Sequence, residues 1–126
     1  MNVVDSSAWL EYLSEGSSAP FFASAIERPA KLVVPTVVLY EVFKKVRQER
    51  GESAALTVAA LLQQGHVVDL TAPIALAAAN VSAAHKLPMA DSIIYATARA
   101  FAATLWTQDA DFKDFPGVRY RAASRR

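Results

Sequence analysis

The sequence predicts an α/β protein: a three-layer α/β/α sandwich with a central parallel sheet of four to five short strands. Two observations lead to this fold class. Short apolar runs alternate along the chain with longer segments of helical spacing, and strands separated by helices pair in parallel with helices on both faces. The runs are apolar throughout, as expected for parallel strands that are covered on both sides.

The first third of the chain predicts a strand and two helices. The short apolar run "MNVVD" predicts a strand that ends in Asp5 and leads into a helix that Ser6 or Ser7 caps. This helix stops at Gly16. A second helix follows over "SSAPFFASAIER", and Pro29 ends it.

The middle of the chain repeats the pattern of strand and helix. "KLVVP" predicts a second strand, after which Thr36 caps a long helix that runs to about Arg50 and is closed by Gly51. "ESAALTVAALLQQG" predicts another helix, and "HVVDL" predicts a third strand.

The last third predicts two helices and two strands. Residues 72–86 form an alanine-rich helix, and "LPMADSIIYATARAFAA" forms one that is apolar almost all round and should be buried on several sides. "TLWTQD" predicts the fourth strand and "VRYR" a last, short one. We expect a single domain over 1–126, with residues 122–126 as a loose tail.

Composition excludes several classes of protein. Hydrophobic residues make up 53% of the 126 residues, which is too many for a disordered chain. There are no cysteines, so disulfides and thiolate metal sites are excluded. No window reads as a membrane span, and no basic region precedes an apolar one at the N-terminus. We therefore expect a cytoplasmic protein with no membrane partner.

Four acids from four segments fall at one predicted edge of the sheet. Asp5 and Asp109 end strands, Glu41 lies near the start of its helix, and Asp91 opens the helix after Pro88. In open parallel sheets, ligands bind at the carboxyl ends of the strands. Each acid alone has an ordinary explanation, as a turn residue, a helix-terminal acid or, for Glu41, a partner of a lysine at i+4. Those explanations do not account for four acids at one edge.

Such a cluster needs a compensating charge. Two carboxylates about 5 Å apart at an effective dielectric near 20 repel by roughly 3 kcal/mol. Several such pairs exceed what a domain with about 5–15 kcal/mol of total stability tolerates. Either some acids are protonated or a cation lies among them. Ligands that are all oxygen favour a hard ion such as Mg²⁺ or Mn²⁺, which can activate water against a phosphodiester.

Four short motifs occur in an order and spacing that resemble PIN-domain ribonucleases: "NVVDSSAWLEYL", "VPTVVLYEVFKKV", "LPMADSIIYATA" and "LWTQDADF". More narrowly, nearly the whole chain resembles the VapC-like toxins of bacterial and archaeal toxin–antitoxin pairs. The resemblance implies a metal-dependent endoribonuclease, usually a homodimer, that a cognate antitoxin silences. For an antitoxin, Phe21 and Phe22 could supply an apolar groove, although both could equally belong to the core.

The resemblance also implies roles for individual residues. The acidic set is Asp5, Glu41, Asp91 and Asp109, of which Asp5, Asp91 and Asp109 would hold the metal. Glu41 would bind a second ion or orient the attacking water. Three further residues would be auxiliary. Ser6 and Thr107 would hydrogen-bond to carboxylates or to the scissile phosphate, and Asp111 would be an acid outside the direct metal ligands.

An acidic site repels RNA, so basic groups must offset it. Lys44, Lys45 and Arg47 follow Glu41 on its helix, and Arg99 follows Asp91 by two turns. These four are candidates for phosphate contacts, although any single one could belong to a solvated helix face. A second basic group lies near the C-terminus: Arg119, Arg121, Arg125 and Arg126.

Two other classes of function remain open. A phosphoacceptor receiver domain has a similar length, and Asp69 ends the third predicted strand where a phosphoacceptor would lie. Such a domain also needs an acidic pair after its first strand and a lysine after its last, which this chain does not offer. The other alternative is a non-catalytic PIN-fold module that serves only for binding.

Overall fold

The computed structural model describes residues 1–123, so Arg125 and Arg126 of the predicted tail lie outside the described residues. The elements follow one another in this order: β1 (Asn2–Val4), α1 (Ser6–Leu13), α2 (Ala19–Ile26), η1 (Pro29–Lys31), β2 (Leu32–Pro35), α3 (Thr36–Arg50), α4 (Glu52–Leu62), β3 (His66–Val68), α5 (Ala72–His85), α6 (Met89–Ala100), β4 (Thr104–Thr107), η2 (Ala110–Phe112) and β5 (Val118–Tyr120). The η elements are single 3₁₀ turns. No helix among the described residues is long and apolar enough to cross a membrane.

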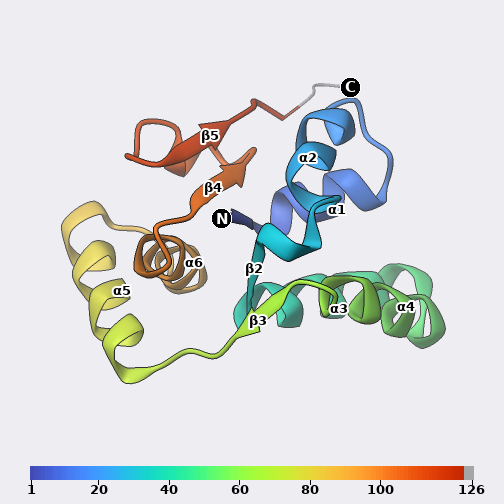
Figure 1. The fold of residues 1–126 in the computed structure, drawn as a ribbon, viewed down its shortest axis with the longest axis horizontal. Coiled ribbons are helices and arrows are strands. Elements are labelled where there is room, and N and C mark those ends of the chain that lie inside the picture. Colours follow the sequence, from blue (N-terminus) through green and yellow to red (C-terminus); the bar gives the residue numbers. More distant parts are fainter. Residues whose placement is uncertain (124–126) are drawn as a thin grey trace.

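The strands form one five-stranded sheet in the order β3-β2-β1-β4-β5, and every neighbouring pair is parallel. In Figure 1, α5 and α6 lie on one side of the row of strands, and α1 and α2 lie on the other. The predicted α/β class with four to five parallel strands is thus confirmed. Because all strands point the same way, the carboxyl ends of β1 and β4 meet at one edge.

The core lies around the three central strands. Leu32 to Pro35 of β2 are all buried, as are Val3, Val4 and Leu105 of β1 and β4. Large side chains from both sides of the sheet complete it, among them Trp9, Phe22 and Phe112. Helix α6 is buried from Ile94 to Ala98, as its apolar circumference predicted. The long apolar helix therefore anchors its own first turn, where Asp91 lies.

The structure corrects three predicted helix ends. Asp5, rather than Ser6 or Ser7, caps α1, because its side chain accepts a hydrogen bond from the backbone N–H of Ala8 at 2.9 Å. Aspartate at this position satisfies an amide that the helix leaves unpaired. Thr36 is the first residue of α3 and makes no capping bond. Pro29 begins the turn η1 after α2 has ended at Ile26.

We expect Leu105→Ala to lower the free energy of unfolding by about 2–5 kcal/mol, because the truncation leaves a cavity in a central strand. Leu105 is 0% exposed and lies between β1 and β5. Leu56→Ala is the matched control, since Leu56 is 55% exposed on α4. Urea denaturation followed by circular dichroism measures both. Equal losses in the two variants would contradict this placement of the core.

Candidate functional site

Asp5 lies at the junction of β1 and α1, where it is 3% exposed. Its Oδ1 accepts hydrogen bonds from the Ser7 hydroxyl at 2.8 Å and from the Ala8 amide at 2.9 Å. Its Oδ2 accepts a short one from the Thr107 hydroxyl. Burial raises the pKa of Asp5 to about 6, although these hydrogen bonds oppose the shift. The carboxyl is thus held in one orientation by the first turn of α1 and by the end of β4.

Thr107 connects the two strand ends. While its hydroxyl donates to Asp5, the same oxygen accepts a hydrogen bond from the backbone N–H of Asp109 at 2.9 Å. The residue is completely buried, so this geometry is shielded from water. The parallel pairing of β1 with β4 makes the connection possible, because the Asp5 amide donates to the carbonyl of Trp106 at 3.1 Å.

Asp91 lies in the first turn of α6, half-buried. Burial is the largest cause of the shift that raises its pKa to about 7. The remaining causes are the negative charges of four neighbouring carboxylates, in decreasing order Asp109, Asp5, Glu41 and Asp111. The four other acids named from the sequence therefore lie close enough for their charges to act on Asp91. Without a cation, this carboxyl retains its proton to near neutral pH.

Glu41 joins the site from α3. Its Oε1 accepts a hydrogen bond from the Ser6 hydroxyl at 2.6 Å, and its side chain is partly buried. The alternative in which Glu41 pairs with Lys45 does not hold, because Lys45 lies 4.0 Å from Glu49 instead. The Ser6 hydrogen bond directs Glu41 towards the strand end and the helix start that carry Asp5.

Three carboxylates lie close enough together to share one ion. Asp91, Asp109 and Asp111 each offer an oxygen, and these oxygens lie within 4.8 Å of one another. Asp109 also caps the turn η2 by accepting from the Asp111 amide at 2.9 Å. The sequence put Asp5 in this closest set and Asp111 outside it. Among the described residues the closest set contains Asp111 instead, while Asp5 is one of the acids whose charge acts on Asp91. Which acids act as metal ligands stays a prediction.

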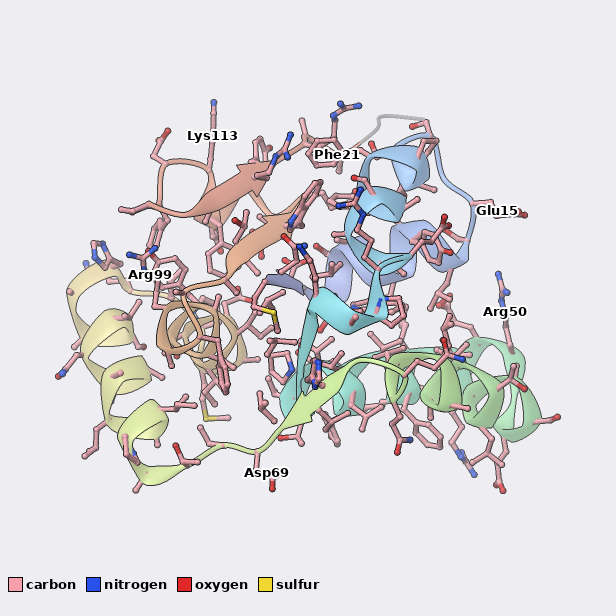
Figure 2. The ribbon with its side chains drawn as sticks, viewed as in Figure 1. Glu15, Phe21, Arg50, Asp69, Arg99 and Lys113 are labelled. Carbon is pink, nitrogen blue, oxygen red and sulfur yellow. The ribbon has the colours of Figure 1, made fainter. Side chains whose placement is uncertain are left out.

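The four basic candidates from the sequence have other neighbours. The ammonium of Lys44 lies 5.7 Å from the ring centre of Tyr40. Arg47 lies 3.7 Å from Glu52, at the helix end remote from Glu41. The remaining two are Lys45, which is near Glu49, and Arg99, whose guanidinium lies against Gly117. In Figure 2, Arg99 lies on the side of α6 that faces the loop before β5. Their role in binding phosphate stays a prediction.

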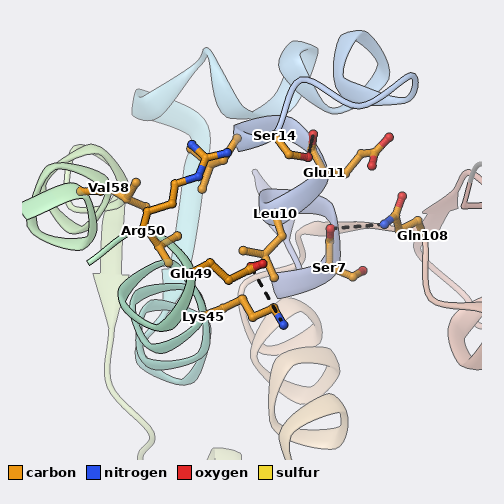
Figure 3. A pocket seen from close by; sticks show the side chains of 12 residues that line it. Ser7, Leu10, Glu11, Ser14, Lys45, Glu49, Arg50, Val58 and Gln108 are labelled. Atoms are coloured by element: carbon orange, nitrogen blue, oxygen red, sulfur yellow. Dashed lines mark hydrogen bonds and ion pairs between the residues drawn. The ribbon is translucent and has the colours of Figure 1, made fainter. Parts of the chain in front are cut away.

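A groove of about 450 Å³ runs past Ser7 and Gln108, and none of the five acids of the site lines it (Figure 3). Helices α1, α3 and α4 line it, together with Gln108 from the end of β4. The amide nitrogen of Gln108 donates to the Ser7 carbonyl at 3.4 Å, whereas its Oε1 is buried without a partner among the described residues. Sequence reasoning missed Gln108, because a lone glutamine between two motif residues carries no pattern.

The structure also places three other residues that were singled out from the sequence. Asp69 follows the edge strand β3, is exposed, and points outward in Figure 2. Its charge is not among those that shift the pKa of Asp5 or Asp91. Phe22 is 0% exposed and belongs to the core, so it cannot line an open groove. Phe21 is half-buried beside Trp106, with the two ring centres 5.1 Å apart.

Comparison with solved structures shows the same fold in three toxin–antitoxin proteins. A toxin–antitoxin complex from Klebsiella pneumoniae has a TM-score of 0.80 and 21% identity, over 94% of this chain and 96% of that chain. VapC20 of Mycobacterium tuberculosis, described as a sarcin–ricin loop cleaving toxin, has a TM-score of 0.77 and 20% identity, over 94% and 97%. VapBC2 of Rickettsia felis, bound to a DNA fragment from its promoter, has a TM-score of 0.73 and 15% identity, over 96% and 97%.

No curated protein matches the chain by sequence. The family model of the PIN domain, in contrast, matches residues 3–118, which takes in every acid of the site from Asp5 to Asp111. The match covers most of the chain and agrees with the parallel sheet and its acidic edge. This chain belongs to the PIN domain family.

Proposed function

We propose that this protein is a divalent-metal-dependent endoribonuclease and the toxin of a toxin–antitoxin pair. One observation carries the proposal: burial, together with the charges of four neighbouring acids, raises the pKa of Asp91 to about 7, and these acids are Asp109, Asp5, Glu41 and Asp111. An arrangement so unfavourable for the folded chain is common where a site serves chemistry. Membership of the PIN domain family supports the same conclusion.

The donor set fits a hard divalent cation. Asp91, Asp109 and Asp111 offer carboxylate oxygens within 4.8 Å of one another, and no histidine or cysteine takes part. All-oxygen sites of this kind favour Mg²⁺ or Mn²⁺. Asp5 would hold the same ion directly or through water. A bound ion of this kind would lower the pKa of a water molecule and stabilise negative charge on a phosphate.

The protein's own residues would orient the reaction. Thr107 and the cap of α1 fix both oxygens of Asp5, so this carboxylate needs no rearrangement when substrate arrives. Ser6 donates to one oxygen of Glu41, which leaves the other free to accept a proton from an attacking water. We assign Glu41 the role of orienting that water, and Ser6 and Thr107 the role of positioning residues.

The relatives suggest the substrate and the partner. VapC20 is described as a toxin that cleaves the sarcin–ricin loop, which supports RNA as the substrate here. The Klebsiella pneumoniae neighbour is a toxin–antitoxin complex, which supports a cognate antitoxin as partner. We retain the homodimer and the single domain over 1–126 as parts of this proposal. Since Phe22 is buried, an antitoxin would have to bind elsewhere than on the pair Phe21 and Phe22.

We expect the purified protein to cleave RNA in Mg²⁺ or Mn²⁺ and to lose this activity in EDTA. Asp5→Asn should reduce the rate at least about 100-fold, because it removes a charge that the site holds in place. Gel analysis of a labelled RNA measures the rate. The matched control is Asp69→Asn, an exposed acid outside the cluster, which should cleave like wild type. Cleavage that persists unchanged in Asp5→Asn would contradict the site assignment. A complete lack of cleavage by wild type would favour a non-catalytic binding module.

Thr107→Val should lower the cleavage rate about 10–100-fold, because the carboxyl of Asp5 loses the hydroxyl that orients it while the volume of the side chain is kept. Thr107→Ser should restore most of the rate. Thr57→Val is the control, since Thr57 lies on the surface of α4 and bonds only to the Ser53 carbonyl. A Thr107→Ser variant as slow as Thr107→Val would show that packing, rather than the hydroxyl, is what matters.

Without a divalent ion, the free energy of unfolding should fall as pH rises from about 4 to about 7. The pKa values of Asp5 and Asp91 are raised to about 6 and about 7, so the folded chain binds more protons than the unfolded chain in this window. Asp91→Asn should flatten the decline and raise stability at pH 8 by about 1–2 kcal/mol, a value reduced because Asp91 is only half-buried.

Mg²⁺ or Mn²⁺ should then stabilise wild type more at pH 8 than at pH 5, because protons compete with the ion for the same oxygens. Urea denaturation with and without EDTA, at both pH values, measures the difference. An equal gain at the two pH values, or an Asp91→Asn variant with the pH dependence of wild type, would contradict the shared acidic site.

A further inference from the structure

Two arginines, Arg119 in β5 and Arg121 directly after it, lie against aromatic rings near the end of β4 that leads into the acidic site. The guanidinium carbon of Arg119 lies 4.5 Å from the ring centre of Trp106 and 5.8 Å from that of Phe21. The guanidinium carbon of Arg121 lies 4.4 Å from the ring centre of Phe21. We call these four side chains the arginine platform: Phe21, Trp106, Arg119 and Arg121.

No carboxylate among residues 1–123 forms an ion pair with the arginines of the platform. The ion pairs found among residues 1–123 are Lys45 with Glu49 and Arg47 with Glu52, so neither platform arginine has a carboxylate within 4.0 Å. Both arginines are exposed. A guanidinium that stacks by its flat face keeps its N–H groups at the edge, where they can donate to an oxyanion in pairs. The aromatic rings therefore hold two guanidinium groups whose N–H donors have no carboxylate partner among the described residues.

The platform is continuous with the acidic site through β4. Trp106 is the register partner of Arg119, and the amide of Arg121 donates to the Thr107 carbonyl at 3.0 Å. Successive side chains of a strand point to opposite faces. Thr107 accordingly directs its hydroxyl to Asp5, whereas Trp106 directs its ring to the platform. The two sites thus lie on either side of one strand end.

We propose that Arg119 and Arg121 bind the phosphate backbone of the RNA strand next to the bond that is cleaved. This inference rests on the proposed function for the identity of the substrate. Five carboxylates repel the phosphates of an approaching RNA, so positive charge must lie close by to offset this repulsion. Lys45 and Arg47 pair with glutamates, Lys44 lies over the ring of Tyr40, and Arg99 lies against Gly117. The platform arginines have no carboxylate partner among residues 1–123 and lie beside β4, which leads into Asp109.

Phe21 would act as a positioning residue for the two guanidinium groups. Its ring contacts both guanidinium groups and is itself held by Phe22, with ring centres 5.1 Å apart. A stacked arginine loses less side-chain freedom on binding than a solvated lysine does. We therefore expect Phe21→Leu to weaken RNA binding without changing the number of charges that contact phosphate.

The test is RNA binding in EDTA, where no cleavage is expected, measured by fluorescence anisotropy of a labelled single-stranded RNA over a range of salt. The double variant Arg119→Gln/Arg121→Gln should bind about 10-fold more weakly than wild type. The slope of log affinity against log salt should become shallower by about 1.4, since two phosphate contacts are lost and each contributes about 0.7. Arg119→Lys/Arg121→Lys should keep the slope of wild type.

Arg28→Gln/Lys31→Gln is the matched control, because it removes the same charge from exposed positions before β2. It should change the slope by much less. Thermal unfolding checks that each variant is folded, and the lysine pair gives the same comparison without loss of charge. Equal slopes for the glutamine pair and wild type would overturn the proposal. Loss of binding to polyglutamate with RNA binding unchanged would also overturn it and assign the platform to an acidic protein.

The two levels of inference fail separately. If wild type neither binds nor cleaves RNA, the proposed function fails and the platform's role fails with it. If wild type binds and cleaves RNA, and the glutamine pair binds RNA as tightly as wild type, only the role of the platform is wrong.

Discussion

The parallel pairing of β1 with β4 is the constraint on which the rest of the site depends. It places the end of β1 beside Trp106, so that the amide of Asp5 bonds to the Trp106 carbonyl at 3.1 Å. The next residue of β4, Thr107, can then donate to Asp5 and accept from the Asp109 amide. The paired strands β1 and β4, far apart in the chain, thereby deliver their acids to one place, joined through the buried Thr107.

The acids of this edge serve the fold and the site at once. Asp5 caps α1 and Asp109 caps η2, while both charges act on Asp91. The capping bonds offset part of the cost of the cluster, because each carboxylate accepts from a backbone N–H that the helix or turn leaves without another acceptor. Burial and the remaining repulsion together raise the pKa of Asp91. A divalent cation would remove that repulsion, which ties the proposed cofactor to stability as well as to catalysis.

Much of the fold and of the acidic site could be predicted from the sequence, for a physical reason. Strand and helix alternation depends on local periodicity, and parallel strands end at one edge, so the neighbourhood of Asp5 and Asp109 followed from topology alone. Capping was misplaced by one residue at the start of α1, because several polar side chains in a row compete for the same amides. Lys45 was equally ambiguous, since Glu41 and Glu49 are both one helical turn away.

The sequence by itself determined the fold class, the acidic set and the PIN-like order of motifs, because these depend on residue type and on distance along the chain. Only the tertiary structure decided which carboxylates lie closest, since Asp111 approaches Asp91 through the turn η2 rather than through any repeated spacing. It alone also placed Arg121 on Phe21. That contact joins residues from opposite ends of the chain, and no local pattern records which face of an edge strand meets which helix.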